Sequence, residues 1–588
     1  MNGAVSAVMS ALTAKIRRSR AYFSAITKND GECMLNYQDA VKNFNLAQAT
    51  QDLLSGSVEA VNACYECCDR HVDAAQPDKV ALYWHGQDGS RKQYSFAQLQ
   101  RYSSQFANFL KQQGVQAGDR VSGLLPRNVE LLITILAIWR IGAVYQPLFT
   151  AFGPKAIEHR LQLAQSKFVV TDLNNRSKLD EVEGCPAILT TQAEDATAYA
   201  DSDLSFWNVL NAQPEHCECT LRTIHDPMLL MFTSGTTGLA KPLQVPLKAL
   251  IAFGRYMLDA VGLTEQDQFW NIADPGWAYG LYYAITGPLL LGHATLFYEG
   301  GFSADSVCEI AKTYNITNLA GAPTAYRMMM AAEPSKMAQL RGQFRRVSSA
   351  GEPLNPEVIR WFKEQLDAPI YDHYGQTEVG MVVCNHHALE HTVQAGVAGF
   401  ASPGYHIAVV DEQGNALPEN TPGILAIDLD QSPLMWFGGY QESRKSPVIQ
   451  HYYLTGDTAE LHADGSMSFV GRSDDVITTS GYRIGPFDVE SALLEHDAVI
   501  EAAVVGVPDP ERTEVVKAFV ILTQGYSASN ELADSLSQFV KKRLSAHAYP
   551  RLVEFVTELP KTPSGKIQRF LLRNQEIHKQ QQNTTQSA

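Results

Sequence analysis

Apolar and polar positions alternate in two distinct ways along the chain between about residues 95 and 410. Short apolar runs with the character of buried strands cover residues 120–125, 167–172, 227–232 and 315–320. Apolar residues at helical spacing occupy 128–140, 247–261 and 304–314. Strands that alternate with helices are typical of layered α/β structure with largely parallel sheets, so we predict that fold class here.

The pattern changes twice toward the C-terminus. Glycine-bearing turns at 411–414 and 463–465 predict a β-rich part over about 405–472. Beyond it, strands at 499–505, 515–522 and 552–556 and a helix at 530–544 predict a small α+β domain. We therefore expect a large N-terminal domain over 34–473, a small mobile C-terminal domain over 474–575, and a polar, disordered tail over 576–588.

Length and charge narrow the possible partners. A chain of 588 residues is too long for one hydrophobic core, so two or more domains are expected. The formal charge of −16, from 47 basic and 63 acidic residues, makes nucleic acid a poor partner because its binding needs basic surface. Apolar residues from Leu131 to Trp139 are followed by Arg140, and no apolar run reaches the roughly 18 residues of a membrane span.

Two segments and the N-terminus allow alternative interpretations. Cys64, Cys67 and Cys68, and the segment HCEC at 216–219, could be zinc ligands, but neither has a second half at metal-ligand spacing, so reduced thiols are favoured. Residues 1–29 hold five basic and no acidic residues. Residues 1–33 are therefore either a mitochondrial presequence or an extension before a start at Met34. We favour the extension and a cytoplasmic protein, with the mitochondrial matrix as the alternative.

The segment FTSGTTGLAK at 232–241 follows an apolar strand and is rich in glycine, hydroxyl groups and lysine. It is not a Walker loop, because the second glycine and the hydroxyl after the lysine are missing. Its backbone N–H groups could still surround a polyphosphate. A solvated turn is the alternative for this segment taken alone.

Four further segments accompany this loop: YDHYGQTEVG at 371–380, YYLTGD at 452–457, GRSDDVITTSGYRIGP at 471–486 and LPKTPSGKIQR at 559–569. In this order and spacing, the five segments resemble the adenylate-forming superfamily of acyl-CoA synthetases, peptide-synthetase adenylation domains and luciferases. The resemblance covers about residues 60–575. It is greatest to short- and medium-chain acyl-CoA synthetases. The loop departs from the family pattern at two positions, where Ala240 replaces a proline and Pro242 replaces a glycine.

The resemblance implies an AMP-forming acid–thiol ligase that uses ATP, Mg²⁺ and coenzyme A. A carboxylate attacks the α-phosphorus of ATP to give an acyl-adenylate and pyrophosphate, and the CoA thiol then attacks the acyl-adenylate. The residues that it implies for ATP are Thr233, Ser234, Gly235, Thr236, Thr237, Gly238 and Lys241 at the phosphates, Gly351, Glu352, Pro353, Asp372, His373 and Tyr374 at adenine, Asp457 and Arg472 at ribose, and Gly375, Gln376 and Thr377 up to the α-phosphate. Glu378 would bind Mg²⁺, while Lys566 and Arg483 would bracket the reacting groups.

The resemblance also implies residues for the second half-reaction and for the acid. Asp474 would be the hinge of the small domain, Ser480, Gly481 and Tyr482 would line the pantetheine tunnel, and Arg512, Lys541 and Arg551 would contact CoA. Trp277, Ala278, Tyr279, Ala350 and Gly375 would line the acyl pocket. Gly375 stands where acetyl-CoA synthetases have tryptophan, so we expect an acid longer than acetate.

Other functions stay open at this point. An acid ligase that loads an acyl carrier protein, an acetyl- or propionyl-CoA synthetase, an ATP hydrolase that releases ADP, and a non-catalytic acyl-adenylate sensor would share many of these residues. The identity of the acid, from propionate to C6–C10 acids or benzoate, and the oligomeric state are not determined by the sequence.

Overall fold

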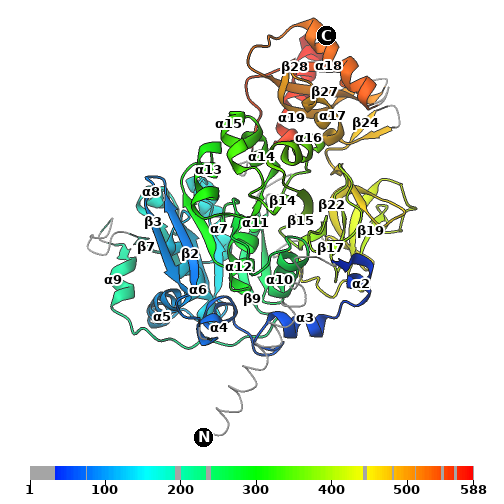
Figure 1. Cartoon of the computed structure of the whole chain (residues 1–588). Helices are drawn as coiled ribbons and strands as arrows, with labels where there is room; N and C mark the ends of the chain where they lie inside the picture. The colour runs from blue at the N-terminus through cyan, green and yellow to red at the C-terminus, as the bar shows by residue number, and fades with distance from the viewer. Residues whose placement is uncertain are drawn as a thin grey trace.

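The computed structural model describes residues 34–74, 76–191, 200, 202–233, 240–440, 446–479, 482–509, 512–544, 548–561 and 566–586. The expected extension over residues 1–33 lies outside them. Figure 1 shows a large α/β body with a smaller domain above it that holds the C-terminal strands and helices. The predicted fold class is therefore confirmed.

Two large sheets form the layers of the N-terminal domain. The strands of the first lie in the order β10 (Lys241–Pro246), β9 (Pro227–Thr233), β5 (Val144–Pro147), β4 (Arg120–Leu124), β6 (Phe168–Asp172), β7 (Ala187–Thr191) and β8 (Leu204–Ser205). Those of the second lie in the order β11 (Phe269–Asn271), β13 (Asn318–Gly321), β14 (Arg346–Ala350), β15 (Ile370–Gln376), β16 (Gly380–Cys384) and β18 (Phe400–Ala401). Most neighbouring strands are parallel, as expected, and both sheets end in antiparallel pairs.

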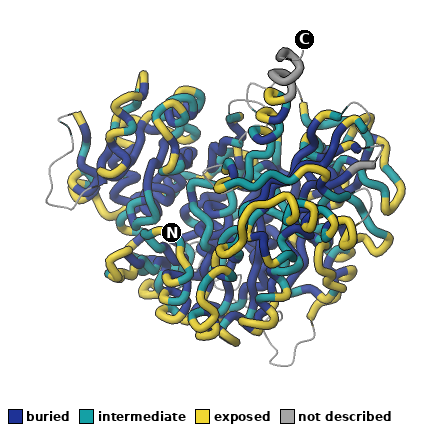
Figure 2. The backbone as a smooth tube through the Cα atoms, turned by 90° about the horizontal axis from the view of Figure 1, so that it is seen from above, coloured by how far each residue is buried: buried dark blue, intermediate teal, exposed yellow. Residues whose placement is uncertain are grey.

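Helices cover these sheets and bury their apolar faces. They include α5 (Phe96–Gln112), α6 (Val129–Arg140), α7 (Pro154–Ala164), α10 (Ala249–Asp259), α13 (Ala304–Thr313), α14 (Pro323–Met330) and α16 (Pro356–Trp361). Helix α6 is apolar on all sides because it is buried between layers. Figure 2 shows that buried positions fill the interior and that exposed positions follow the outer helices and loops.

One predicted strand begins three residues later than expected. Helix α13 ends where Asn315 takes a left-handed conformation with φ of 50°, and the N–H of Ile316 then donates to Ala311 O. This is the usual way in which a helix C-terminus satisfies its last carbonyl groups. Residues 315–317 therefore terminate the helix, and strand β13 starts only at Asn318.

The β-rich part and a three-stranded sheet complete the large domain. The β-rich part contains β19 (Ile407–Val410), β20 (Gly423–Asp428), β21 (Val448–Ile449), β22 (Tyr452–Leu461) and β23 (Met467–Arg472), all in antiparallel pairing. The small sheet contains β12 (Thr295–Glu299), β2 (Val80–Gly86) and β3 (Arg91–Ser95). In strand β22, Asp457 is paired with Arg472 of β23, so both are presented at one sheet position.

The C-terminal domain is the expected α+β unit. Its sheet contains β24 (Ile477–Thr479), β25 (Tyr482–Ile484), β26 (Val499–Asp509), β27 (Thr513–Leu522) and β28 (Leu552–Phe555), with helices α17 (Pro486–Leu494) and α18 (Asn530–Arg543). Asn355, just before α16, donates to Ser491 Oγ of α17 at 2.8 Å. This bond links the two domains in the orientation seen in Figure 1.

The described part of the tail that we expected to be disordered, residues 576–586, is helical. Helix α19 covers Arg569–Gln586, so it includes most of that tail. Glu576 is buried and forms an ion pair with Lys517 at 2.7 Å, and Leu572 packs in an apolar cluster of the domain. The polar composition misled the prediction because a few apolar and charged contacts on one helix face are enough to bind it to β26 and β27.

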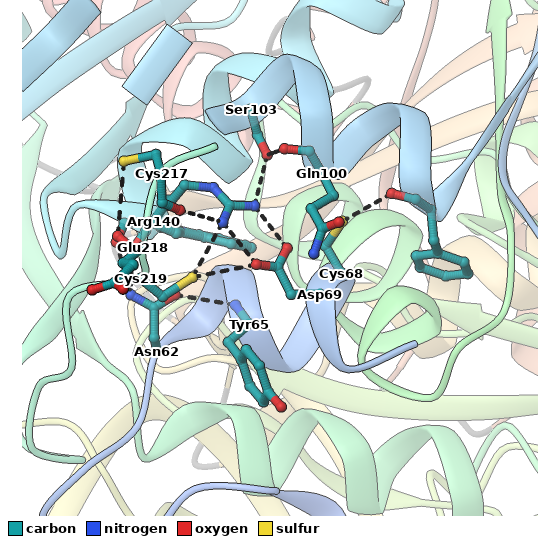
Figure 3. A network of polar contacts seen from close by, with 12 residues as sticks. Asn62, Tyr65, Cys68, Asp69, Gln100, Ser103, Arg140, Cys217, Glu218 and Cys219 are labelled. Atoms are coloured by element: carbon teal, nitrogen blue, oxygen red, sulfur yellow. Dashed lines mark hydrogen bonds and ion pairs between the residues drawn. The ribbon is translucent and has the colours of Figure 1, made fainter. Parts of the chain in front are cut away.

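The two cysteine segments meet around a buried ion pair (Figure 3). The guanidinium of Arg140 is 2.7 Å from each carboxylate oxygen of Asp69 and also donates to Ser103 Oγ and Cys217 O. Cys219 Sγ lies 3.5 Å from the same guanidinium. Thus a protein cation occupies the centre of this cluster, and the described residues contain no group of three ligands arranged for a metal.

None of the helices in the described part of the chain has the length and apolar character needed to cross a membrane.

Candidate active site

The hairpin of β15 and β16 carries the predicted nucleotide residues from Asp372 to Thr377. A β-bulge lies between Tyr374 and Gly375, and the two strands approach closely there. Tyr374 and Gln376 point to one side of β15, where both contact Asp457. His373 points to the other side, where Tyr256 and Asn385 contact its ring. Burial lowers the pKa of His373 to about 3, so its side chain is a neutral core residue.

Asp457 is the centre of the polar network. Its Oδ2 accepts hydrogen bonds from Tyr374 Oη at 2.6 Å and Gln376 Nε2 at 2.8 Å, and its Oδ1 is 3.2 Å from Arg472 Nη1. Burial raises the pKa of Asp457, while the charges of Arg472 and Lys566 and the two hydrogen bonds oppose that rise. The arrangement therefore holds a carboxylate in place in a site that excludes most solvent.

Lys566 belongs to the C-terminal domain, yet its charge acts on Asp457 of the large domain. The ammonium group is exposed and lies on the segment just before α19. The two residues are 109 positions apart in the sequence. Arg483 lies in β25, but its side chain is outside the described residues.

Glu378 follows β15 in a turn and is only 7% exposed. Its Oε1 accepts a hydrogen bond from Tyr440 Oη at 2.5 Å. Burial raises the pKa of Glu378, and the bond from Tyr440 lowers it. The preceding residue, Thr377, is held by its carbonyl, which accepts from Tyr282 Oη at 3.0 Å. Sequence reasoning missed Tyr440, although the Gly-Gly turn before it marks a loop.

The predicted phosphate loop connects β9 to β10, which pair antiparallel. Ser234, Gly235, Thr236, Thr237 and Gly238 lie outside the described residues, and Thr233 and Lys241 flank them as the paired ends of the two strands. Pro242 is tolerated because β10 is an edge strand, where a proline removes no N–H from a central ladder. Ala240 O is 3.0 Å from a ring nitrogen of His159, which anchors the end of the loop.

The segment Gly351-Glu352-Pro353 connects β14 to α16, beside the hairpin. Gly351 has φ of 99°, a conformation that favours glycine. Directly after this segment, the backbone N–H of Leu354 donates to Asp372 Oδ2. The other carboxylate oxygen, Asp372 Oδ1, is buried and has no hydrogen-bond partner in the described part of the chain. Burial raises the pKa of Asp372 to about 7. A cavity of about 390 Å³ adjoins this carboxyl group.

Glu352 is turned away from that carboxyl group. Its side chain accepts from Thr324 Oγ1 at 3.0 Å and from Arg327 Nη2 at 3.1 Å. It therefore fastens the turn to α14.

Among the predicted acyl-pocket residues, Ala278, Tyr279 and Ala350 pack in the main core cluster, and Trp277 packs against a smaller neighbouring one. Trp277 packs against Phe149 and Phe152, with ring centroids 5.4 and 5.6 Å away. The ring of Tyr279 packs against the ring of Tyr283. Ala350 is fully buried at the end of β14, next to the turn that begins at Gly351.

Gly375 does not face an open pocket. A Cβ atom there would lie 2.1 Å from Gly380 O and 2.7 Å from Met381 Cα. Our interpretation that its missing side chain leaves room for an acyl chain is therefore wrong in this structure. The glycine is needed because the two strands of the bulged hairpin come too close for any side chain.

The structure describes the predicted hinge residue, Asp474, but only part of the predicted pantetheine-tunnel segment. Asp474 Oδ1 is 3.4 Å from Arg472 Nε, and Arg573 of α19 donates to the Asp474 carbonyl. Ser480 and Gly481 and the side chain of Tyr482 lie outside the described residues.

Two of the predicted CoA cations share one aromatic ring. Lys541 Nζ and the Arg551 guanidinium lie 5.1 and 4.8 Å from the ring of Tyr549. Arg512 lies beside Asp509, where β26 connects to β27. Tyr549 was not predicted as a site residue, although an aromatic residue near basic ones in the sequence is a usable signal.

Two family models and several known proteins match this chain. The family model of AMP-binding enzymes matches residues 69–433, and that of the AMP-binding enzyme C-terminal domain matches residues 488–566. Acetyl-coenzyme A synthetase of Bacillus subtilis is 37% identical over 559 residues, covering 92% of this chain and 95% of its own. The mitochondrial acyl-coenzyme A synthetase ACSM4 of Rattus norvegicus is 38% identical over 576 residues, covering 95% of both chains.

Solved structures give the same result. An acyl-CoA synthetase of Brucella canis is 57% identical, with a TM-score of 0.76, and the match covers 93% of this chain and 100% of that one. The anthranilate CoA ligase AuaEII in complex with anthranoyl-AMP is 26% identical, with a TM-score of 0.80 over 88% of this chain and 98% of that one.

Proposed function

The chain belongs to the family of AMP-binding enzymes, and from that premise we propose that its substrate is a short- or medium-chain carboxylic acid longer than acetate. It is an ATP-dependent acyl-CoA synthetase, which converts an acid, ATP and CoA to acyl-CoA, AMP and pyrophosphate through an acyl-adenylate. It is therefore an acid–thiol ligase whose partners are small molecules.

The surroundings of Asp457 give the most direct support for this function. A buried carboxylate, Asp457, is fixed by Tyr374, Gln376 and Arg472 and is reached by the charge of Lys566 from the other domain. A carboxylate with fixed lone pairs suits the two hydroxyl groups of a ribose. An ammonium group beside it suits the negative charge that gathers when a carboxylate attacks a phosphate. We assign Asp457 to the ribose and Lys566 to the reacting groups.

The surroundings of Glu378 fit a magnesium ion. Mg²⁺ prefers oxygen ligands, and Glu378 offers a buried carboxylate whose Oε2 is not the oxygen bound by Tyr440. A cation there would compensate the cost of burying the charge. Bound Mg²⁺ would offset the charge of the phosphates, which the loop between Thr233 and Lys241 would surround with N–H groups.

The proposal of an acid longer than acetate now rests on other residues than Gly375. The indole of Trp277 is held in the cluster with Phe149 and Phe152, and two of the other lining positions, Ala278 and Ala350, carry small side chains. This combination supports space for further methylene groups beside the reacting carboxylate.

In the second half-reaction the small domain must turn, since the thiol needs the space that Lys566 occupies. We assign the hinge to Asp474. The group of Lys541, Tyr549 and Arg551 offers an aromatic face and two cations, which suit the adenine and phosphates of CoA.

The test is pyrophosphate release across straight-chain acids from C2 to C12 plus benzoate, with CoA present. We expect a maximum above C2. A maximum at acetate would reject the proposed acid class. Repeating the assay with holo-acyl carrier protein in place of CoA distinguishes the carrier-loading alternative, which predicts faster turnover with the carrier.

For the location we propose the cytoplasm, with the mitochondrial matrix as the alternative because the names of some relatives include "mitochondrial". Expression of the whole chain and of a form starting at Met34, each fused to a fluorescent protein in eukaryotic cells, tests this. Mitochondrial import that depends on residues 1–33 would favour the alternative.

A further inference from the structure

Tyr440 lies between the proposed metal ligand and the proposed phosphate loop. Its hydroxyl donates to Glu378 Oε1 at 2.5 Å, which is short for an O–H···O bond and typical of a charged acceptor. The two residues are 62 positions apart in the sequence. The bond therefore depends on the tertiary fold.

The other side of Tyr440 is tied to the strand that leaves the phosphate loop. Its backbone forms an isolated bridge with Leu243 of β10. Two residues earlier on the same strand, Lys241 places its Nζ 5.5 Å from the centre of the Tyr440 ring. One side chain thus touches a carboxylate with its hydroxyl and an ammonium group with its ring face.

The orientation of the ring is fixed by aromatic neighbours. Phe437 packs against Tyr440 with centroids 5.0 Å apart and against Tyr453 with centroids 5.3 Å apart. Tyr453 in turn donates to Gln376 Oε1 at 3.2 Å. Because its ring is packed in this way, Tyr440 can hold its hydroxyl at one place beside Glu378.

We propose that Tyr440 is a positioning residue that orients the Glu378 carboxylate for magnesium–ATP. This inference rests on the proposed role of Glu378. A carboxylate has about four lone-pair sites, and the Tyr440 hydroxyl takes one on Oε1, so Oε2 is left to face a cation. Without that bond the carboxylate could turn about its last torsion. Partners of this kind typically change metal affinity by roughly 10–100-fold.

The variant Tyr440→Phe removes only the hydroxyl and keeps the ring that Lys241 and Phe437 contact. The measurement is calorimetric titration of Mn²⁺ into the whole protein saturated with α,β-methylene-ATP, a non-cleavable analogue, so that no turnover occurs. We expect about a tenfold or greater loss of Mn²⁺ affinity, with an unchanged midpoint of thermal unfolding. In the steady state, the Mg²⁺ concentration for half-maximal rate should rise while the rate at saturating Mg²⁺ falls much less.

Two further variants make the result decisive. Tyr452→Phe is the matched control, since Tyr452 lies on β22, next to Tyr453, and its ring packs against His451. Its Mn²⁺ affinity should equal that of the parent. Glu378→Gln should lose Mn²⁺ affinity, and adding Tyr440→Phe to it should cost little more. If Glu378→Gln loses affinity but Tyr440→Phe does not, the positioning role is wrong and the metal ligand stands. If Glu378→Gln binds Mn²⁺ normally, the assignment of Glu378 fails and the inference fails with it.

Discussion

A methyl group on Gly375 would lie 2.1 Å from the carbonyl oxygen of Gly380. The β-bulge at this position brings the two strands together, and only a residue without a side chain fits. The conflict is with backbone atoms, which cannot move aside as a flexible side chain can. Gly375 is therefore a requirement of the hairpin that carries the nucleotide residues.

It follows that Gly375→Ala should impair every substrate alike. We expect loss of most pyrophosphate release with acids from C2 to C8 and a lower midpoint of thermal unfolding, because the strands must separate to admit the new Cβ. Gly301→Ala is the control, since a Cβ at Gly301 meets nothing within 4 Å. Selective loss of the longer acids, with acetate activity retained, would instead restore the acyl-pocket assignment.

The sequence could predict the order of strands and helices because their apolar periodicity reports burial, and it could place Asp457 and Lys566 through recognisable segments. It could not predict that Gly375 faces Gly380, because a bulge reverses side-chain directions without leaving a pattern in the sequence. Nor could it pair Tyr440 with Glu378. That contact depends on how the β-rich part packs against β15, which local periodicity does not encode.

Asp372 gives a pH-dependent contribution to stability. Its pKa rises from 3.8 to about 7 on folding because the carboxyl group is buried. At a pH below 3.8, the pKa of the unfolded state, the Asp372 carboxyl group is protonated in both the folded and the unfolded protein, and the stabilisation is fully present. It is lost as the pH rises through about 7, by about 1.4 kcal/mol per unit of pH and about 4 kcal/mol at most.

Asp372→Asn should remove this dependence while its side-chain oxygen still accepts from Leu354 N. We expect the free energy of unfolding of the parent, relative to the variant, to fall between about pH 4 and pH 7 and then to level off. Urea denaturation without nucleotide measures it. The exposed residue Asp367 provides the control variant Asp367→Asn. Parallel pH profiles for parent and Asp372→Asn would contradict the raised pKa.

The hinge assignment predicts a separation of the two half-reactions. Asp474→Pro restricts its own φ and the conformation of Ser473, so the small domain should be confined to one orientation. We expect the present orientation, in which Arg472 and Arg573 both contact Asp474, to be the adenylating one. ATP–pyrophosphate exchange should therefore survive while overall thioester synthesis falls at least tenfold. Steady-state thioester synthesis within a few-fold of the parent would show that Asp474 is not the pivot.

The buried ion pair of Asp69 and Arg140 predicts a large effect on stability. Asp69→Asn would leave the guanidinium of Arg140, which is 1% exposed, without its counter-charge. Such a change typically costs about 3–5 kcal/mol in the free energy of unfolding. Glu495→Gln is the control, since it breaks an exposed pair with Arg543 that should contribute less than about 1 kcal/mol. If urea denaturation gave the same loss in the free energy of unfolding for both variants, the buried pair would contribute no more to stability than the exposed one.

The charge of Lys566 beside Asp457 predicts which half-reaction depends on it. In this orientation the charge of Lys566 acts on Asp457 of the large domain, and the proposed turn of the small domain would take it away. Lys566→Ala should therefore reduce ATP–pyrophosphate exchange by about 10²–10³-fold, the usual cost of one charged transition-state donor. Thioester formation from supplied acyl-adenylate and CoA should change little. Lys566→Gln, which mimics acetylation by removing the charge, should behave in the same way.

Lys561→Ala is the control, because Lys561 lies on the same segment and pairs with Glu501 within the small domain. In this variant both half-reactions should persist. A similar loss in both half-reactions for Lys566→Ala would mean that Lys566 supports the domain as a whole and that the proposed division of labour between the two orientations is wrong.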